Sequence, residues 1–127
     1  MFHQAQPQTS APVVRLTPGE QQLLADFADR ALATLGAAGI ERILVFGSRA
    51  RGAGHADSDL DVAVFAPKTL GADAHRQLAD LAEEAQAGWE GLPHLRPILV
   101  RTGDPTNPAL LRAIAREGIE VWAKKNG

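Results

Sequence analysis

The chain has 127 residues, of which 13 are basic, 15 acidic and none cysteine, and 45% are hydrophobic. This length suits one domain with a single core, and a net charge of −2 argues against a broad electrostatic attraction to nucleic acid. The absence of cysteine excludes a disulfide framework and cysteine-ligated zinc, and no apolar run reaches the roughly 20 residues of a membrane span, so we expect a cytoplasmic protein.

The first part of the chain predicts an N-terminal arm followed by a helix. Residues 1–16 are polar and lack periodicity, which is typical of a flexible arm. Thr17–Glu20 combines an N-cap, a proline at the first helical position and a capping box. Apolar residues then recur at three-and-four spacing as far as Leu35, and Gly36 and Gly39 end the helix.

Two apolar runs predict strands in the middle of the chain. Arg42–Phe46 is consistent with a strand buried on both faces. Asp59–Phe65, which Pro67 ends, alternates between two faces. One face carries Leu60, Val62 and Val64, and the other carries Asp59, Asp61, Ala63 and Phe65.

The second half predicts two more helices and two more strands. A helix spans residues 73–88, and we expect its inner face to carry His75, Leu78, Leu81, Ala82 and Ala85. Leu95–Val100 is a strand in which Pro97 lacks a ladder donor, so it is an edge or bulged strand. A helix from residue 107 to 118, the strand 119–122 and a tail at 124–127 complete one α/β domain over residues 17–123.

A glycine–serine pair follows the first strand, and an acid pair opens the second. Gly47 lets the backbone approach a phosphate, and Ser48 and the amides after it can donate to phosphate oxygens. Beyond a ten-residue spacer, Asp59 and Asp61 project from one strand face, about 7 Å apart at ~3.3 Å per residue. Such oxygen ligands suit Mg²⁺ or Mn²⁺, and acids at this spacing can flank two ions roughly 3.5–4 Å apart.

Each half of this pattern also has an ordinary explanation. A Gly-Ser pair is more often a turn, and an Asp-x-Asp is more often part of a solvated loop. However, two aspartates on one face of an otherwise apolar strand repel each other unless a cation lies between them. This placement favours a metal site.

Competing motifs fail at defined positions. Asp57-x-Asp59-x-Asp61 resembles the start of an EF-hand loop, but Val62 and Lys68 replace its glycine and its last glutamate. Ala53-Gly54 stands where a P-loop needs lysine and serine or threonine. The glycines lack the dinucleotide-binding spacing, and the four histidines lack zinc-ligand spacing.

Two segments together resemble the signature of the DNA polymerase β-type nucleotidyltransferase superfamily. They are Gly47-Ser48-Arg49-Ala50-Arg51-Gly52 and Asp57-Ser58-Asp59-Leu60-Asp61-Val62-Ala63-Val64. The pattern is most similar to the minimal nucleotidyltransferase (MNT) branch, whose members are often encoded beside a HEPN-domain partner. The resemblance implies an α+β fold with a small mixed sheet flanked by helices, dependence on Mg²⁺ or Mn²⁺, and transfer of a nucleoside monophosphate from ATP or another NTP to a hydroxyl.

The resemblance also assigns roles to residues. Gly47, Ser48 and Arg49 would bind the nucleotide, while Asp59 and Asp61 would be catalytic and bind the metal. The family usually has a third acid on a later strand, whereas His94–Val100 contains none and Glu90 and Asp104 only flank it. Either another residue such as His94 fills this role, or catalysis is weakened or lost.

Two functions follow as expectations. The first is a nucleotidyltransferase antitoxin that transfers AMP from ATP to a hydroxyl on a HEPN-domain partner. The second is a binding module of the same fold that neutralises a HEPN ribonuclease by forming a complex. An antibiotic-modifying nucleotidyltransferase is a weaker alternative, because such enzymes usually carry an additional domain for the acceptor. The sequence leaves nucleotide preference and self-association open.

Overall fold

The computed structural model describes residues 16–36, 39–47, 59–67, 69–103 and 108–124. In chain order its elements are α1 (Pro18–Leu35), β1 (Arg42–Phe46), β2 (Leu60–Pro67), α3 (Ala74–Ala87), β3 (Leu95–Thr102), α4 (Pro108–Glu117) and β4 (Ile119–Ala123). Every helix and strand expected from the sequence is present, with bounds that differ by at most two residues. The expected α+β class is confirmed.

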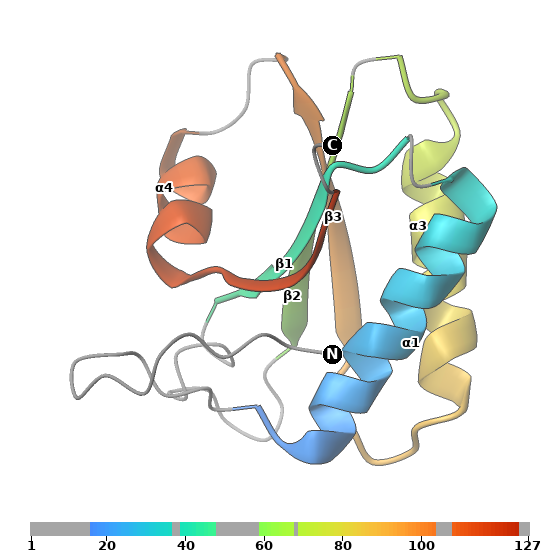
Figure 1. Cartoon of the computed structure of the whole chain (residues 1–127). Coiled ribbons are helices and arrows are strands. Elements are labelled where there is room, and N and C mark those ends of the chain that lie inside the picture. Colours follow the sequence, from blue (N-terminus) through green and yellow to red (C-terminus); the bar gives the residue numbers. More distant parts are fainter. Residues whose placement is uncertain (1–15, 37–38, 48–58, 68, 104–107, 125–127) are drawn as a thin grey trace.

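The strands of the described residues form one mixed sheet in the order β3-β2-β1-β4 (Figure 1). β1 is antiparallel to both β2 and β4, whereas β2 is parallel to β3. A parallel pair needs a crossover connection, and α3 provides it. Pro97 lies in an edge strand as expected, and β1, in the interior of the sheet, is buried from Ile43 to Phe46.

The predicted capping box begins α1. The Thr17 hydroxyl accepts a hydrogen bond from the Glu20 amide at 3.1 Å, and the Glu20 carboxylate accepts one from the Thr17 amide at 3.0 Å. Leu16, the last residue of the expected arm, is only 5% exposed and belongs to the core. The core therefore includes the residue just before the helix cap.

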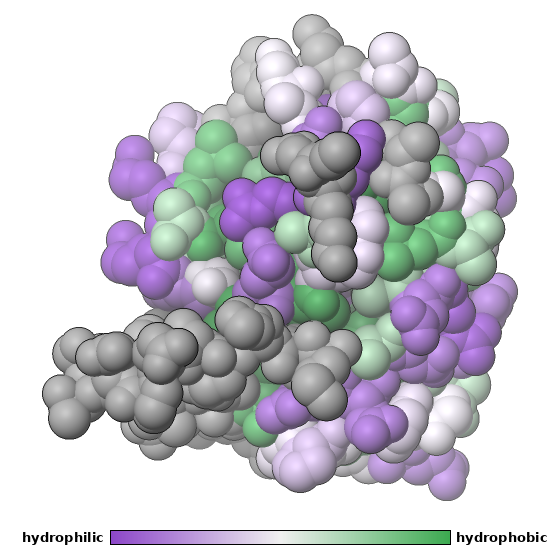
Figure 2. Space-filling view, viewed as in Figure 1, coloured by the Kyte–Doolittle hydropathy of each residue, from purple (hydrophilic) through white to green (hydrophobic). Residues whose placement is uncertain are grey.

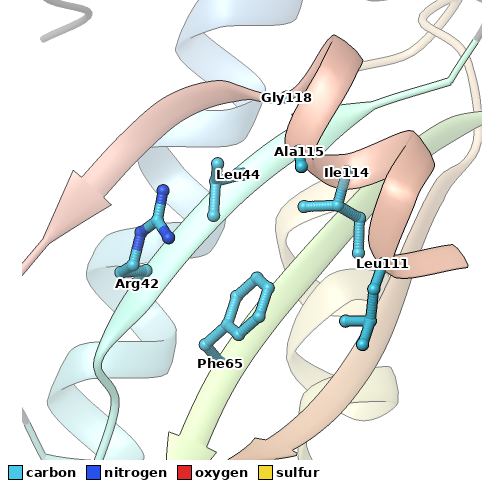
Figure 3. A pocket seen from close by; sticks show the side chains of 7 residues that line it. All are labelled: Arg42, Leu44, Phe65, Leu111, Ile114, Ala115 and Gly118. Carbon is cyan, nitrogen blue, oxygen red and sulfur yellow. The ribbon is translucent and has the colours of Figure 1, made fainter. Parts of the chain in front are cut away.

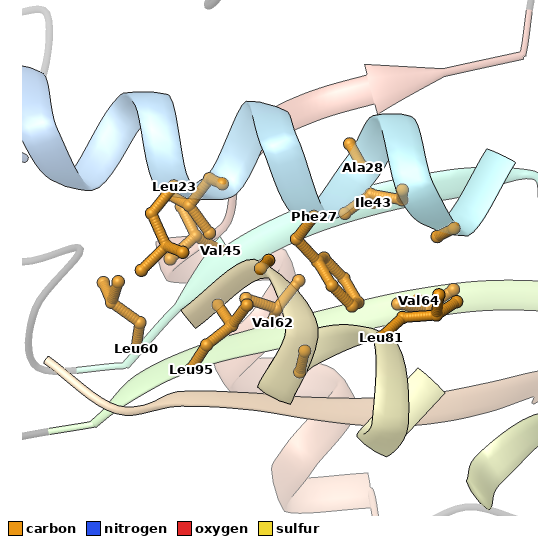
Figure 4. Close-up of a cluster of buried hydrophobic side chains, with 14 of the residues drawn as sticks. Leu23, Phe27, Ala28, Ile43, Val45, Leu60, Val62, Val64, Leu81 and Leu95 are labelled. Atoms are coloured by element: carbon orange, nitrogen blue, oxygen red, sulfur yellow. The ribbon is translucent and has the colours of Figure 1, made fainter. Parts of the chain in front are cut away.

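The two faces of the sheet are covered unequally. α1 and α3 pack on one face and α4 packs on the other (Figure 1). The larger hydrophobic cluster lies under α1 and α3 and includes Leu60, Val62 and Val64 of β2 (Figure 4). The smaller cluster, under α4, consists of Leu44, Phe46, Ala63, Val100 and Ile114. The predicted alternation of β2 is therefore confirmed, and it places Asp61 on the α4 face.

One expectation for α3 is wrong. The buried residues of this helix are Ala74, Leu78, Leu81, Ala82 and Ala85, whereas His75 is exposed. Ala74 lies four residues before Leu78 and continues the buried stripe, and His75 is turned about 100° further round the helix. His75 therefore faces solvent.

The face shown in Figure 2 is mainly polar, with hydrophobic residues visible both on the α4 side and on the side of α1 and α3. Leu111 of α4 is the most exposed large hydrophobic residue of the described chain, at 39%. Among the described residues, no helix combines the length and the apolar character that a membrane span requires.

Candidate functional site

The structure describes three of the five residues that the sequence assigned to the site. Gly47 directly follows β1, Asp59 directly precedes β2, and Asp61 is the second residue of β2. Ser48 and Arg49 lie outside the described residues. The described part of the site therefore lies where β1 ends and β2 begins, at the same end of these two adjacent strands.

Gly47 and Asp61 are in close contact. The antiparallel register pairs Phe46 with Asp61, so Gly47 comes next to this pair. Gly47 has a φ of 88°, and a Cβ built on it would lie only 2.8 Å from the Asp61 Oδ2. Both the left-handed backbone and the close approach require glycine. The sequence predicted such an approach to a phosphate, and the structure shows one to the Asp61 carboxylate.

Asp61 also forms an ion pair with Arg96 on the neighbouring strand. The parallel register of β2 and β3 places Arg96 directly beside Asp61. The Arg96 Nε donates a hydrogen bond to the Asp61 Oδ1 at 2.9 Å. The side chain of Asp61 is 20% exposed and that of Arg96 is 57% exposed, so the carboxylate is largely shielded from solvent while the guanidinium is not.

The environment of Asp61 raises the pKa of its carboxyl. Burial is the largest cause, and the negative charge of Asp59 adds to it. The charge and the hydrogen bond of Arg96 act in the opposite direction without cancelling the effect. A poorly solvated carboxylate near a second one is stabilised by an added positive charge, and this is the electrostatic property of a cation site.

The third acid of the site is not found among the described residues. The residue of β3 beside Asp61 is Arg96, and no group of three or more His, Asp or Glu side chains in the described chain could hold a metal ion. The His94 carbonyl accepts a hydrogen bond from the Leu60 amide at 2.8 Å, but its side chain is exposed, as is Glu90. Asp104 lies outside the described residues.

Asp59 and Asp61 would supply some of the ligands that a divalent cation requires. Asp59 and Asp61 offer hard oxygen ligands, and Mg²⁺ is commonly bound by one or two carboxylates together with substrate phosphates and water. Arg96 is the site residue that sequence reasoning missed. Its signal is the pairing of β2 with β3, which is not visible in the local pattern of either strand.

A separate pocket lies at the other end of the same sheet face. It has a volume of about 290 Å³ and is formed between α4, β1 and β2 (Figure 3). Its lining residues are Arg42, Leu44, Phe65, Leu111, Ile114, Ala115 and Gly118. The Arg42 guanidinium lies 5.6 Å from the centre of the Phe65 ring. Phe65 is four residues beyond Asp61, about 13 Å along the strand, so this apolar pocket is distinct from the acid pair.

Comparison with protein families identifies the domain. A family model described as "Polymerase beta, Nucleotidyltransferase" matches residues 34–126, which include Gly47, Asp59 and Asp61. The chain belongs to this nucleotidyltransferase family. The comparison with curated proteins found no match.

Several solved structures share this nucleotidyltransferase fold. One is a chain of a toxin–antitoxin complex with AMP-PNP, with a TM-score of 0.57 and 22% identity over 80% of this chain and 74% of that chain. A protein from Sulfolobus solfataricus has a TM-score of 0.56 and 16% identity over 84% and 83%. A third chain comes from a complex of the tri-AMPylated Shewanella oneidensis HEPN toxin with its MNT antitoxin, with a TM-score of 0.51 and 21% identity over 81% and 72%. At these identities, the likeness establishes the fold.

Proposed function

We propose that this nucleotidyltransferase transfers AMP from ATP to a hydroxyl group of a HEPN-domain partner protein. The observation that carries the proposal is the shielded Asp61, with Asp59 two residues before it and the backbone of Gly47 against its Oδ2. Two similar structures support the choice of nucleotide and partner, since one contains AMP-PNP and the other a tri-AMPylated HEPN toxin.

Asp59 and Asp61 are the residues that would bind the divalent cation, Mg²⁺ or Mn²⁺. Once bound, this ion would neutralise charge on the nucleotide phosphates. Gly47 has no side chain, so its backbone can approach a phosphate closely, and we assign Ser48 and Arg49 to the same triphosphate. In the proposed reaction the acceptor oxygen bonds to the α-phosphorus, the bond to pyrophosphate breaks, and the acceptor proton passes to solvent or to a base on the partner.

The first test compares the site aspartates with a surface aspartate. Asp59→Ala and Asp61→Ala should each reduce labelling of the partner by α-labelled ATP roughly a hundredfold or more, because they remove several kcal/mol of charge stabilisation. The matched control is Asp73→Ala, since the Asp73 side chain is 75% exposed and makes no capping hydrogen bond. Undiminished labelling with both site variants would refute the assignment.

A second candidate function is neutralisation of the HEPN partner by binding alone. It is favoured by Arg96, which lies beside Asp61 where an acid would complete a three-carboxylate site. The same variants separate the two functions when they are co-expressed with the partner. Continued growth with Asp59→Ala would favour binding alone, and renewed toxicity would favour catalysis.

A further inference from the structure

The two oxygens of the Asp61 carboxylate have different neighbours. Oδ1 accepts the hydrogen bond from the Arg96 Nε at 2.9 Å. Oδ2 faces the backbone at Gly47, where even a methyl group would approach to 2.8 Å. A cation that binds the Oδ1 of Asp61 is therefore repelled by the positive charge of the Arg96 guanidinium.

Arg96 differs from an ordinary surface partner in the carboxylate that it contacts. Its Asp61 partner is 20% exposed, whereas in the pair formed by Arg42 and Glu120 the acid is 54% exposed and the distance is 3.9 Å. Exposed pairs contribute little because water competes with them. A charge-assisted hydrogen bond to a shielded carboxylate is stronger, so displacing Arg96 from Asp61 has a real cost.

The position of Arg96 also allows its side chain to move away from Asp61. β3 is an edge strand, and the Arg96 side chain is 57% exposed. Its guanidinium can turn into solvent without disturbing the core, because the buried residue beside it in β3 is Leu95, which packs in the cluster on the opposite face. Release of Arg96 is therefore a local side-chain movement.

We propose that Arg96 is an intramolecular competitor of the divalent cation: its guanidinium neutralises Asp61 until a metal ion replaces it, which weakens metal binding by the isolated chain. The proposal rests on the proposed function, since it requires that Asp61 is a metal ligand. Arg96 is a positioning residue in this scheme and sets the affinity for metal. The positive charge of Arg96 also explains how the Asp61 carboxylate can remain shielded from solvent although Asp59 lies close by.

The test measures Mn²⁺ binding to the full chain without nucleotide, by electron paramagnetic resonance of the free ion. Arg96→Gln should tighten binding about tenfold or more, because hydrogen bonds to charged groups have net strengths in this range. Arg96→Lys keeps the positive charge and should stay closer to the unsubstituted chain. Arg42→Gln is the matched control, as it removes the same charge from a side chain that is 51% exposed, and it should leave the affinity unchanged.

The outcomes separate the two proposals. If Asp61→Asn abolishes binding while Arg96→Gln has no effect, competition by Arg96 is refuted and the metal site stands. If Arg42→Gln tightens binding as much as Arg96→Gln does, net charge is the cause and competition is also refuted. If Asp61→Asn binds Mn²⁺ as the unsubstituted chain does, the metal assignment fails, and the inference about Arg96 fails with it.

Discussion

Gly47 has a φ of 88° and contacts Asp61, so its replacement should have two separable effects. Gly47→Ala places a methyl group in a left-handed backbone, at a cost of about 1–2 kcal/mol, and also pushes it against the Asp61 Oδ2. Gly91 is the matched control, because it has a φ of 81° but no atom within 4 Å of the place that an added methyl group would take. Gly91→Ala should show the backbone cost alone.

Urea unfolding measures how much free energy of unfolding each of the two variants loses. We expect Gly47→Ala to lose more than Gly91→Ala, because the added methyl group must also displace the Asp61 carboxylate, and to lose labelling of the proposed partner. Equal losses for the two variants would show that the contact with Asp61 has no energetic weight.

The carboxyl of Asp61 makes a second prediction, about pH. Its pKa is raised above the ordinary value of 3.8, mainly by burial, so the folded state binds the proton more tightly than the unfolded state does. The stabilisation by this proton is complete below pH 3.8 and is lost as the pH rises through the folded pKa. At neutral pH the ionised side chain therefore destabilises the fold.

Asp61→Asn removes that ionisation while keeping an oxygen for Arg96. In metal-free buffer its thermal midpoint should exceed that of the unsubstituted chain at neutral pH, and the difference should shrink as the pH falls through the folded pKa of Asp61 and be lost below pH 3.8. Asp73→Asn, at a position 75% exposed, should show no such trend. A pH-independent difference for Asp61→Asn would contradict the role of burial.

The chemistry of individual residues was predictable where the residue types were unusual for their surroundings. Asp59 and Asp61 stand out at the start of an apolar strand, and Gly47 follows a buried one. Arg96 does not stand out, because an arginine in an edge strand is ordinary. Its importance comes from contact with a residue 35 positions earlier in the chain, and a pairing across a crossover connection is not encoded in local periodicity.

At the scale of elements, the sequence predicts helices and strands because their periodicities differ. The alternation in β2 separates Val62 from Ala63 correctly, and Thr17 and Glu20 form the capping box that their spacing predicts. The direction of strand pairing was not predictable in this way. The apolar run of β1 indicates burial on both faces, but it does not determine that both neighbours are antiparallel.

The error at His75 has the same origin. A buried stripe on a helix is defined to within one residue on either side, and the neighbours that cover it decide which residue is included. Here Ala74 is 1% exposed and belongs to the stripe. Propensity and spacing therefore locate an element more accurately than they locate its rotation.

At the scale of the whole molecule, the candidate site lies on the less covered face of the sheet. Asp61 shares the α4 face with the smaller cluster, whereas the larger cluster lies under α1 and α3. α4 has a single buried residue, Ile114, while α1 has six. Binding regions commonly belong to the less stable parts of a fold. Here α4, which has little buried surface, covers the face of the sheet that carries Asp61.

Because α4 buries fewer residues than α1, we expect α4 to detach from the sheet more readily than α1 does. Backbone amides of α4 should exchange with deuterium faster than those of α1, because little apolar surface must be exposed when α4 detaches. Ile114→Ala should accelerate exchange in α4 and leave α1 unchanged, since it truncates the one fully buried side chain of that helix. The control Phe27→Ala, at a fully buried position, should destabilise all strands together, at a cost of about 3–5 kcal/mol. Equal protection of α1 and α4 in the unsubstituted chain would mean that the sheet and both of its faces unfold as one unit, and the site-bearing face would then have no independent mobility to use in binding.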